Sequence, residues 1–413
     1  MKNESGSAGT EDKKIAQIDK IMLSLESTSK QTAVITQCEG DLTNNQFEEL
    51  LDKKRFLIGF TNGVYDLNTD SFRNGTPDDY VSMNVGYDYN EEKMNEQEIY
   101  DEIMEFLDKV FPQEGVLHYV LKFLSTCLTG YTKEQLIHLG VGTGSNGKSM
   151  LLSLMAITLG KYAQKMESTF ICGSTPDANS PTPALTAVVG SRFVYFSEFK
   201  KGAKLNEQLF KSLCGEDKFR YRPLYGESKE FQPDFKLFMI CNPTELPTFD
   251  GSDHAMIRRI RVIPFVSTFT NDTQENEDEY IFMKDSTISE KINNWKHVFI
   301  RLLLHYYKLY INEGLIAPIY IKKASNKYSM NNNLYEQYIK ECLVVTNLDE
   351  DKIRASELYK HFRNWIKEQG LPSNSSYVDN CLGSIFIKLL PNNTRNNVGR
   401  FYLNIKIKSN TVV

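Results

Sequence analysis

Residues 137–149 read Ile-His-Leu-Gly-Val-Gly-Thr-Gly-Ser-Asn-Gly-Lys-Ser, and this stretch decides the fold class. Its second part, Gly142 to Ser149, matches the phosphate-binding pattern Gly-x-x-x-x-Gly-Lys-[Ser/Thr]. The apolar run before it predicts a short strand, and the residues from Gly147 to Leu159 predict a helix. This order is the context that a phosphate-binding loop requires; the alternative is a chance glycine-rich turn.

The loop predicts ATP and Mg²⁺ as cofactors. Its glycines let backbone N–H groups converge on phosphate oxygens, and the helix that follows adds the positive end of its dipole. Lys148 offers a charge to the β- and γ-phosphates, and the Ser149 hydroxyl is a ligand for Mg²⁺. The residues expected to contact the nucleotide are Gly142, Thr143, Gly144, Ser145, Asn146, Gly147, Lys148 and Ser149.

Beyond the loop, short apolar runs alternate with segments that have helical periodicity. This alternation predicts an α/β domain with a largely parallel central sheet. The strands are expected at 192–196, 235–241 and 260–265, with helices at 205–214 and 287–312. Such a sheet places the ends of its strands at one edge, where a nucleotide binds.

Polar residues follow these expected strands at the places where an ATPase needs them. Glu198 ends the strand that begins at Arg192, and a carboxylate there can hold metal and polarise the attacking water. Asn242 ends the next strand, where its amide can contact the γ-phosphate. Arg258 and Arg259 are candidates for an arginine finger. The alternatives are an idle strand-end glutamate, a turn-forming asparagine and salt-bridged structural arginines.

Together these motifs resemble the superfamily 3 helicases, in particular their poxvirus-type primase–helicase branch. The resemblance covers roughly residues 50–270. It rests on the ordered motifs Gly-Ser-Asn-Gly-Lys-Ser, Ser197-Glu198, Gly215-Glu216-Asp217, Arg222-Pro223-Leu224-Tyr225, Cys241-Asn242-Pro243 and Arg258-Arg259-Ile260, and on residues 60–67 and 78–80 in the preceding part.

The resemblance implies an AAA+-type ring, usually hexameric, that hydrolyses ATP and translocates on single-stranded DNA. Lys148 and Ser149 carry over as phosphate and Mg²⁺ ligands, Glu198 as the catalytic acid and a metal ligand, and Asn242 as the sensor. Either Arg258 or Arg259 carries over as the finger. Many members have two acidic residues at the end of this strand, whereas this chain has Ser197 before Glu198. The resemblance therefore assigns the catalytic role there to a single carboxylate.

The candidate DNA contacts lie between the acid and the sensor. A hairpin from Phe219 to Phe231 stands where such helicases insert one into the ring pore, with Tyr225 and Lys229 able to contact a base or a phosphate. Lys200 and Lys201 form a second candidate. The alternative for both is a solvated surface loop.

The flanking segments complete the expected domain plan. We expect a flexible tail or frayed helix at 1–40, a small, mostly helical domain at 41–130, the ATPase domain at 131–324 and a winged-helix-like domain at 334–413. No primase domain is recognisable, so we expect no primase activity and a separate primase or replication protein as a partner.

Composition is consistent with this plan. The 48 Lys and Arg against 53 Asp and Glu give a formal charge of −5, but residues 1–130 carry 12 basic and 24 acidic side chains, so the remainder is basic. A local basic surface suffices for DNA binding.

The seven scattered Cys favour no disulfide framework. Without a signal peptide or an apolar run of membrane-spanning length, we expect a soluble, cytoplasmic protein, at a viral replication site if the source is a virus.

Other functions remain open from the sequence alone. A packaging motor or a small NTP kinase would use the same phosphate loop, although no second phosphate-acceptor pocket is evident. An origin-binding adaptor would bind DNA through the C-terminal domain and use ATP for assembly alone.

Overall fold

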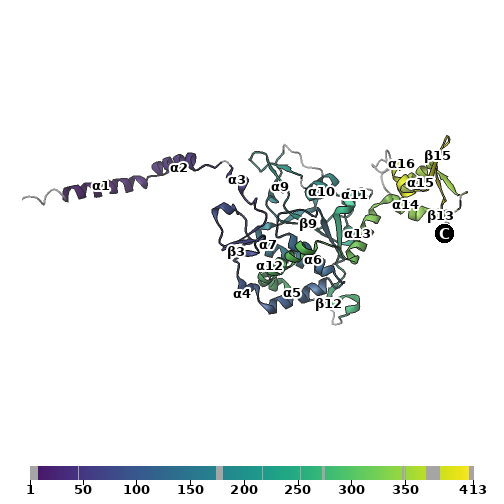
Figure 1. Ribbon diagram of the computed structural model, residues 1–413, viewed down its shortest axis with the longest axis horizontal. Helices are drawn as coiled ribbons and strands as arrows, with labels where there is room; N and C mark the ends of the chain where they lie inside the picture. The colour runs from purple at the N-terminus through teal and green to yellow at the C-terminus, as the bar shows by residue number, and fades with distance from the viewer. Residues whose placement is uncertain are drawn as a thin grey trace, which may run out of the picture. The chain divides into compact units, whose positions relative to one another are not determined.

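The structure is a computed structural model, in which the chain divides into two compact units, residues 1–53 and 54–413 (Figure 1). It describes residues 8–44, 46–173, 180–215, 217–251, 253–271, 275–346, 348, 350–368 and 382–408. Each unit is described by itself.

A parallel sheet of five strands forms the centre of the larger unit, in the order β10-β4-β9-β6-β5. Its strands are β4 Ile137–Val141, β5 Ala163–Glu167, β6 Phe193–Ser197, β9 Lys236–Cys241 and β10 Ile260–Pro264. β4 and β9 are buried along nearly their whole length, as expected for parallel strands covered on both faces. The predicted α/β class with a central parallel sheet is therefore confirmed.

Helices and short elements connect these strands. They are α7 Lys148–Leu159, η2 Gly160–Tyr162, α8 Ser168–Cys172, α9 Pro183–Ala187, α10 Glu207–Cys214, η3 Pro243–Glu245 and α11 His254–Arg259. β7 Phe219–Tyr221 and β8 Lys229–Phe231 pair antiparallel, so the hairpin expected between the acid and sensor strands is present. After β10 come β11 Thr268–Thr270, η4 Glu277–Glu279, β12 Ile281–Met283 and α12 Ile288–Glu313.

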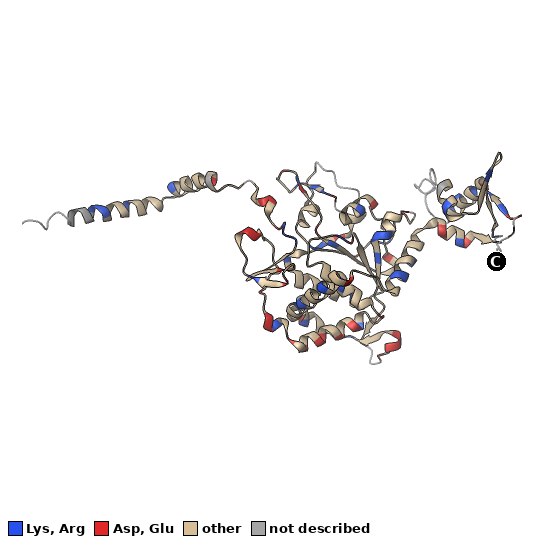
Figure 2. Cartoon of the chain, viewed as in Figure 1, with Lys and Arg blue, Asp and Glu red and all other residues tan. Residues whose placement is uncertain are grey.

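The segment before the sheet combines a small antiparallel sheet with helices. β1 Leu57–Phe60, β2 Gly63–Asp66 and β3 Ser71–Arg73 form the sheet, followed by η1 Pro77–Asp79. The helices are α4 Glu91–Met94, α5 Gln97–Val110 and α6 Val116–Thr126, and acidic residues are frequent along α4 and α5 (Figure 2). The helical spacing of apolar residues over 91–129 in the sequence predicts helix throughout this range, but the structure interrupts it. Pro112, which lacks an N–H, and Gly115, at φ 73°, separate α5 from α6.

One hydrophobic core joins this segment to the ATPase sheet. Ile58 and Leu107 pack in the same buried cluster as Leu151 of α7 and Trp295 of α12. α12 lies against both α6 and α7. The segment before residue 130 thus shares a core with the sheet domain that carries the phosphate loop.

Two elements of the sheet domain were missing from the sequence-based expectation. β5 is a partly exposed edge strand with polar residues, so it has no apolar run. α13 Ile319–Asn332 continues past residue 324, where we placed the end of the domain. The hydroxyl of buried Tyr328 donates to the Pro247 carbonyl, and Ser325 Oγ accepts from the Val262 N–H at 2.9 Å. These contacts hold the polar second half of α13 against β10.

The C-terminal residues form a module with its own core. Its elements are α14 Leu334–Cys342, β13 Leu343–Val345, β14 Lys352–Arg354, α15 Ala355–Glu368, α16 Leu382–Leu389, β15 Asn393–Asn396, β16 Gly399–Leu403 and β17 Ile405–Ile407. The order of helices, followed by a β15–β16 hairpin that pairs with β14, is winged-helix-like, as expected. The Ser- and Asn-rich residues 373–376, whose composition predicts a loop, lie outside the described residues.

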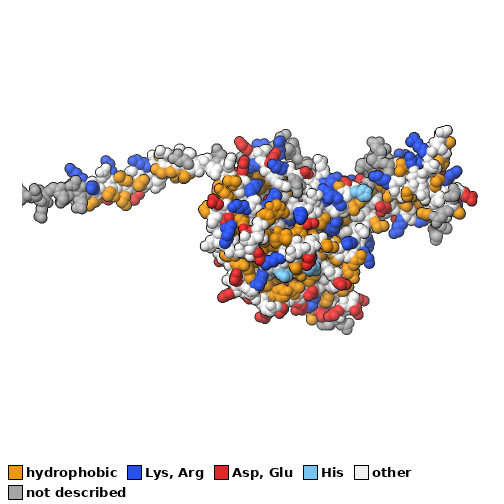
Figure 3. Space-filling model, in the orientation of Figure 1, with side chains coloured by type: hydrophobic (Ala, Val, Ile, Leu, Met, Phe, Trp, Pro, Cys, Tyr) orange, Lys and Arg blue, Asp and Glu red, His pale blue; other side chains and the backbone are white. Residues whose placement is uncertain are grey.

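The smaller unit, residues 1–53, contains α1 Ala8–Leu25, α2 Thr28–Leu42 and α3 Phe47–Leu50. Ile15, Ile18 and Met22 of α1 are each more than half exposed, and apolar side chains are visible along this helix (Figure 3). Regular helix therefore occupies most of the segment for which we expected a tail or a frayed helix.

Candidate functional site

A cavity of about 490 Å³ opens at the carboxyl ends of the central strands. The phosphate loop follows β4, Glu198 follows β6, and Asn242 follows β9. Because β9 lies between β4 and β6, Asn242 stands between the loop and Glu198 along the edge of the sheet. The cavity is lined by Gly144, Ser145, Asn146, Gly147, Lys148, Ser149, Met150, Leu152, Ser153, Lys165, Tyr195, Ser197, Glu198, Ile240, Cys241, Asn242 and Glu245.

Two glycines of the loop are required by its geometry. Gly147 is at φ 81°, and a Cβ there would lie 2.6 Å from Cγ2 of Val110. Gly142 is buried, and a Cβ there would lie 2.5 Å from the Phe265 carbonyl oxygen. The backbone thus packs closely against α5 and the end of β10. Gly142 and Thr143 are the two predicted loop residues that do not line the cavity.

Lys148 is buried and held within the loop. Its Nζ donates to the Gly142 carbonyl at 2.6 Å and to Asn146 Oδ1 at 2.8 Å. Burial lowers the pKa of the Lys148 ammonium, because the charged form loses hydration. Nδ2 of Asn146 is buried and has no hydrogen-bond partner among the described residues. An added phosphate would favour the charged lysine and offer acceptor oxygens to such donors.

Glu198 is exposed to the cavity and has an unusual backbone. Its φ is 62°, in the left-handed region, which costs a non-glycine residue roughly 1–3 kcal/mol. Its carbonyl accepts a hydrogen bond of 3.1 Å from Ser168 Oγ at the start of α8. The left-handed conformation of Glu198 turns the chain away from β6 directly after the strand ends. The hydrogen bond from Ser168 of α8 stabilises this turn.

Asn242 is paired with a carboxylate that the sequence reading missed. Its Nδ2 donates to Oε2 of Glu245 at 3.0 Å, across the first turn of η3. Glu245 also lines the cavity, so it supplies a second carboxylate beside Glu198. The Asn-Pro-x-Glu spacing at 242–245 was the available signal.

Three further residues line the cavity without having been singled out as site residues in the sequence. Lys165 lies on the edge strand β5, Tyr195 on β6 and Cys241 at the end of β9. Burial raises the pKa of the Cys241 thiol to about 12, so it stays protonated at neutral pH and is a poor nucleophile. Lys165 is exposed and adds a second cation to the site.

The residues present fit a magnesium–nucleotide complex. The described residues contain no cluster of three or more His, Cys, Asp or Glu side chains placed to hold a metal. Mg²⁺ in nucleotide sites takes most of its oxygens from phosphates and water, with few protein ligands. The Ser149 hydroxyl and the Glu198 carboxylate, which share the cavity, are suitable for that role.

Both finger candidates lie at the end of α11, and neither lines this cavity. Arg258 is exposed, and its Nη2 donates to Gln135 Oε1 at 3.3 Å. Arg259 is partly buried, with Nη1 donating to the Ala255 carbonyl and a buried Nε that has no partner among the described residues.

The DNA-contact candidates are on the surface of the sheet domain. Tyr225 is 98% exposed at the tip of the β7–β8 connection, at φ 64°, and Lys229 is exposed at the start of β8. An Arg220–Glu230 ion pair of 3.1 Å joins the two strands. Lys200 and Lys201 are exposed in the loop after Glu198.

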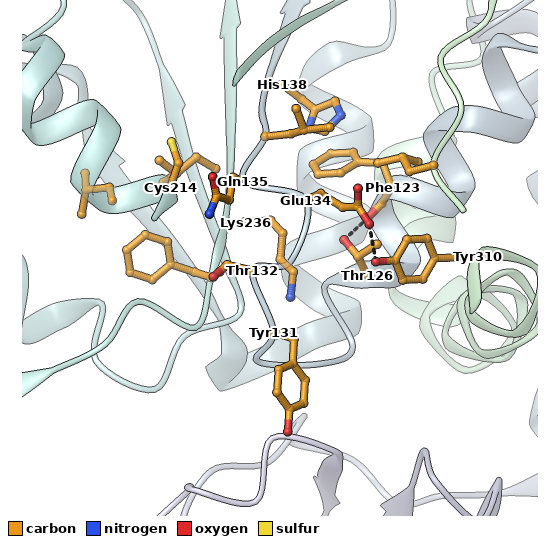
Figure 4. A pocket seen from close by; sticks show the side chains of 15 residues that line it. Phe123, Thr126, Tyr131, Thr132, Glu134, Gln135, His138, Cys214, Lys236 and Tyr310 are labelled. Carbon is orange, nitrogen blue, oxygen red and sulfur yellow. Dashed lines mark hydrogen bonds between the residues drawn. The ribbon is translucent and has the colours of Figure 1, made fainter. Parts of the chain in front are cut away.

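A second cavity, of about 20 Å³, lies at the opposite, amino-terminal ends of β4 and β9 (Figure 4). Burial lowers the pKa of Lys236 to about 7, although its Nζ donates to the Thr129 carbonyl. His138, stacked on Phe123, also has its pKa lowered by burial. This space holds little more than one water, so we assign it to the core.

Two parts of the chain match known protein families. Residues 1–112 match the family described as "D5 N terminal like", and residues 141–259 match a family of unknown function, DUF5906.

None of the helices in the described ranges has the length and apolar character needed to cross a bilayer.

The similar curated proteins come from viruses. "Putative helicase L207/L206" of Acanthamoeba polyphaga mimivirus is 33% identical over 371 residues, 88% of this chain and 38% of that protein. "Putative helicase 121R" of Invertebrate iridescent virus 3 is 28% identical over 85% of this chain and 39% of that protein. "Putative primase C962R" of African swine fever virus is 23% identical over 88% and 39%. The chain spans about two fifths of the length of these relatives.

A solved structure, "The A form apo structure of NrS-1 C terminal region-CTR", aligns with 67% of this chain and 60% of that chain, at a TM-score of 0.42 and 14% identity. The match at the N-terminal part and the matches to viral helicases and primases agree with the ordered motifs of the cavity. The chain belongs to the D5-type primase–helicase family.

Proposed function

We propose that the chain is an ATP-dependent DNA helicase motor that translocates on single-stranded DNA during replication of a viral or mobile genome. The observation that carries the proposal is the single cavity in which the phosphate loop, Glu198 and Asn242 come together. The names of the viral relatives support the same role.

The cavity residues have distinct tasks in ATP hydrolysis. The loop N–H groups and Lys148 bind the phosphates and neutralise charge that develops on the γ-phosphoryl group. Ser149 and Glu198 would hold Mg²⁺, which would neutralise charge on the phosphate oxygens when bound. Glu198 orients the attacking water and accepts its proton, and Asn242 contacts the γ-phosphate or that water.

The active form is proposed to be a ring, with six copies as the family resemblance implies. Arg258 and Arg259 lie outside the cavity of their own chain, so either one would complete the site of a neighbouring copy. A finger supplied in trans is worth about 10³–10⁵ in rate. The exposed hairpin tip with Tyr225 and the adjacent Lys229 would then contact DNA in the pore, with Lys200 and Lys201 as a second contact.

A DNA-packaging ATPase or an ATP-dependent origin-binding adaptor is the runner-up, and the winged-helix-like module favours the adaptor. Glu198→Gln separates the adaptor from the motor. This substitution should leave ATP binding intact and abolish hydrolysis. A motor would then lose its cellular function, whereas an adaptor that uses ATP for assembly alone would keep its function. A separate primase or replication protein remains the proposed partner.

The direct test is hydrolysis of ATP by the purified chain with and without single-stranded DNA, together with unwinding of a tailed duplex. We expect DNA-stimulated hydrolysis and unwinding in the wild type and neither in Lys148→Ala. Unwinding by Lys148→Ala at the wild-type rate would refute the assignment.

A further inference from the structure

The nucleotide cavity extends beyond Glu198 to the edge strand of the sheet. The strand order runs from β4, which carries the phosphate loop, through β9 and β6 to β5. Neighbouring strands are roughly 4.8 Å apart, so β5 stands about 14 Å from β4. Lys165 of β5 nevertheless lines the same cavity as the loop. A cation therefore lies on the far side of Glu198 from the phosphate loop.

The strand register puts this cation beside a phenol. Lys165 is directly opposite Tyr195 of the parallel strand β6, so the two side chains share one face of the sheet. Tyr195 packs against the buried cluster that contains Leu151 of α7, so this is the face that α7 covers. Ser153 of α7 lines the cavity as well. The outer part of the cavity thus has walls from β5, β6 and α7.

The side chains of these three walls are hydrogen-bond donors. Among the described residues, no acceptor is recorded for Lys165 Nζ or for the hydroxyls of Tyr195 and Ser153. Burial raises the pKa of the Tyr195 phenol, so it keeps its proton and can donate. Lys165 and Ser153 are exposed to the cavity. An ammonium and two hydroxyls suit the oxygens of a phosphate ion.

Hydrolysis of ATP would send its product toward these donors. Water attacks the γ-phosphorus in line with the bond that breaks, from the side of Glu198. The new P–O bond forms while the bond to the bridging oxygen breaks, ADP leaves with that oxygen and its electron pair, and Glu198 accepts a proton from the water. The phosphoryl group therefore moves away from the loop, toward β6 and β5. Protonation of Glu198 also removes a carboxylate charge that would repel the phosphate.

We propose that Lys165, with the hydroxyls of Tyr195 and Ser153, binds the inorganic phosphate that ATP hydrolysis releases. This inference rests on the proposed function and assigns a product subsite to the same cavity. The other role open to Lys165 is contact with the γ-phosphate of bound ATP. The sheet order favours the product, because the strands that carry Asn242 and Glu198 stand between the loop and β5.

The test measures phosphate binding without hydrolysis. The full chain is saturated with ADP and Mg²⁺, so that the phosphate loop is occupied, and equilibrium dialysis against radiolabelled inorganic phosphate gives the affinity and the stoichiometry. Lys165→Gln removes the charge, and Lys165→Arg keeps it. Lys161→Gln is the matched control, because Lys161 is exposed in η2 and does not line the cavity. The affinity for a non-hydrolysable ATP analogue is measured for every variant.

We expect the wild type to bind one phosphate per chain and Lys165→Gln to bind it about tenfold or more weakly, as for the loss of a charge-assisted hydrogen bond. Lys161→Gln should match the wild type, and Lys165→Arg should retain most of the affinity. The affinity for the ATP analogue should stay at the wild-type value in all three variants. Wild-type phosphate affinity in Lys165→Gln, or an equal loss of affinity for the ATP analogue, would overturn the proposal.

The same measurements separate this proposal from the motor assignment. ADP binding by the wild type without phosphate binding would refute the product subsite alone, whereas a chain that binds no nucleotide would refute both. Steady-state hydrolysis gives a second readout. Added phosphate should inhibit the wild type, and the inhibition constant should be about tenfold higher in Lys165→Gln. Equal inhibition of both proteins would contradict the role of Lys165.

Discussion

Asn242 and Glu245 form a hydrogen-bonded pair in the wall of the nucleotide cavity, with Asn242 Nδ2 donating to Glu245 Oε2 at 3.0 Å. The carboxylate orients the amide that would contact the γ-phosphate or the attacking water. A hydrogen bond to a charged group is worth about 1.5–3 kcal/mol. Glu245 is therefore a positioning residue for the proposed sensor.

Glu245→Ala should lower kcat for ATP about 10-fold to 100-fold and change KM little, because the pair acts on a group that binds in the transition state. Steady-state hydrolysis gives both constants. In an Asn242→Ala background, adding Glu245→Ala should lower kcat no further. Independent, additive losses in that double-mutant cycle would contradict the positioning role.

Gly147→Ala should abolish nucleotide binding, because it adds both left-handed strain and a Cβ 2.6 Å from Val110 Cγ2. Gly86→Ala is the matched control. Its φ of 85° is similar, but a Cβ there meets nothing within 4 Å. Titration with a fluorescent ATP analogue should show normal binding for Gly86→Ala. Equal losses in both variants would mean that strain alone, and not the close packing of the loop on α5, explains the effect.

Lys236 should make stability depend on pH. Burial lowers its pKa in the folded protein from an ordinary 10.5 to about 7. Between those values the unfolded chain binds a proton that the folded chain does not, so the free energy of unfolding rises with pH in this window, by at most about 1.4 kcal/mol per pH unit from this group. Lys236→Met should remove that rise. Denaturant unfolding at pH 7 and pH 9 measures it, and an unchanged difference between the two pH values would exclude the lysine as its source.

The finger can be identified by mixing variants. Arg258→Ala and Arg259→Ala are made separately, and the one that carries the finger should lose hydrolysis while retaining ATP binding. Mixing it with Lys148→Ala should restore part of the activity, because the Lys148→Ala copy still supplies an arginine to its neighbour's intact phosphate loop. If neither mixture recovers any activity, a finger acting in trans is excluded.

The sequence predicted what depends on local patterns. Apolar runs gave β4, β6, β9 and β10 nearly to the residue, and the loop motif fixed the position of Lys148. It missed β5, since a partly exposed edge strand needs no apolar run. It also missed Glu245, whose role depends on a turn that brings its carboxylate back to Asn242. The second half of α13 is polar, and its place against β10 rests on tertiary hydrogen bonds such as that of Ser325.

The central claim is that the cavity around Lys148 hydrolyses ATP to move the chain along DNA. The most direct measurement is ATP hydrolysis by the wild type and Lys148→Ala, each with and without single-stranded DNA. We predict hydrolysis that rises on adding DNA in the wild type and is lost in Lys148→Ala, with the fold retained. Hydrolysis that does not respond to DNA, or that persists in Lys148→Ala, would contradict the account.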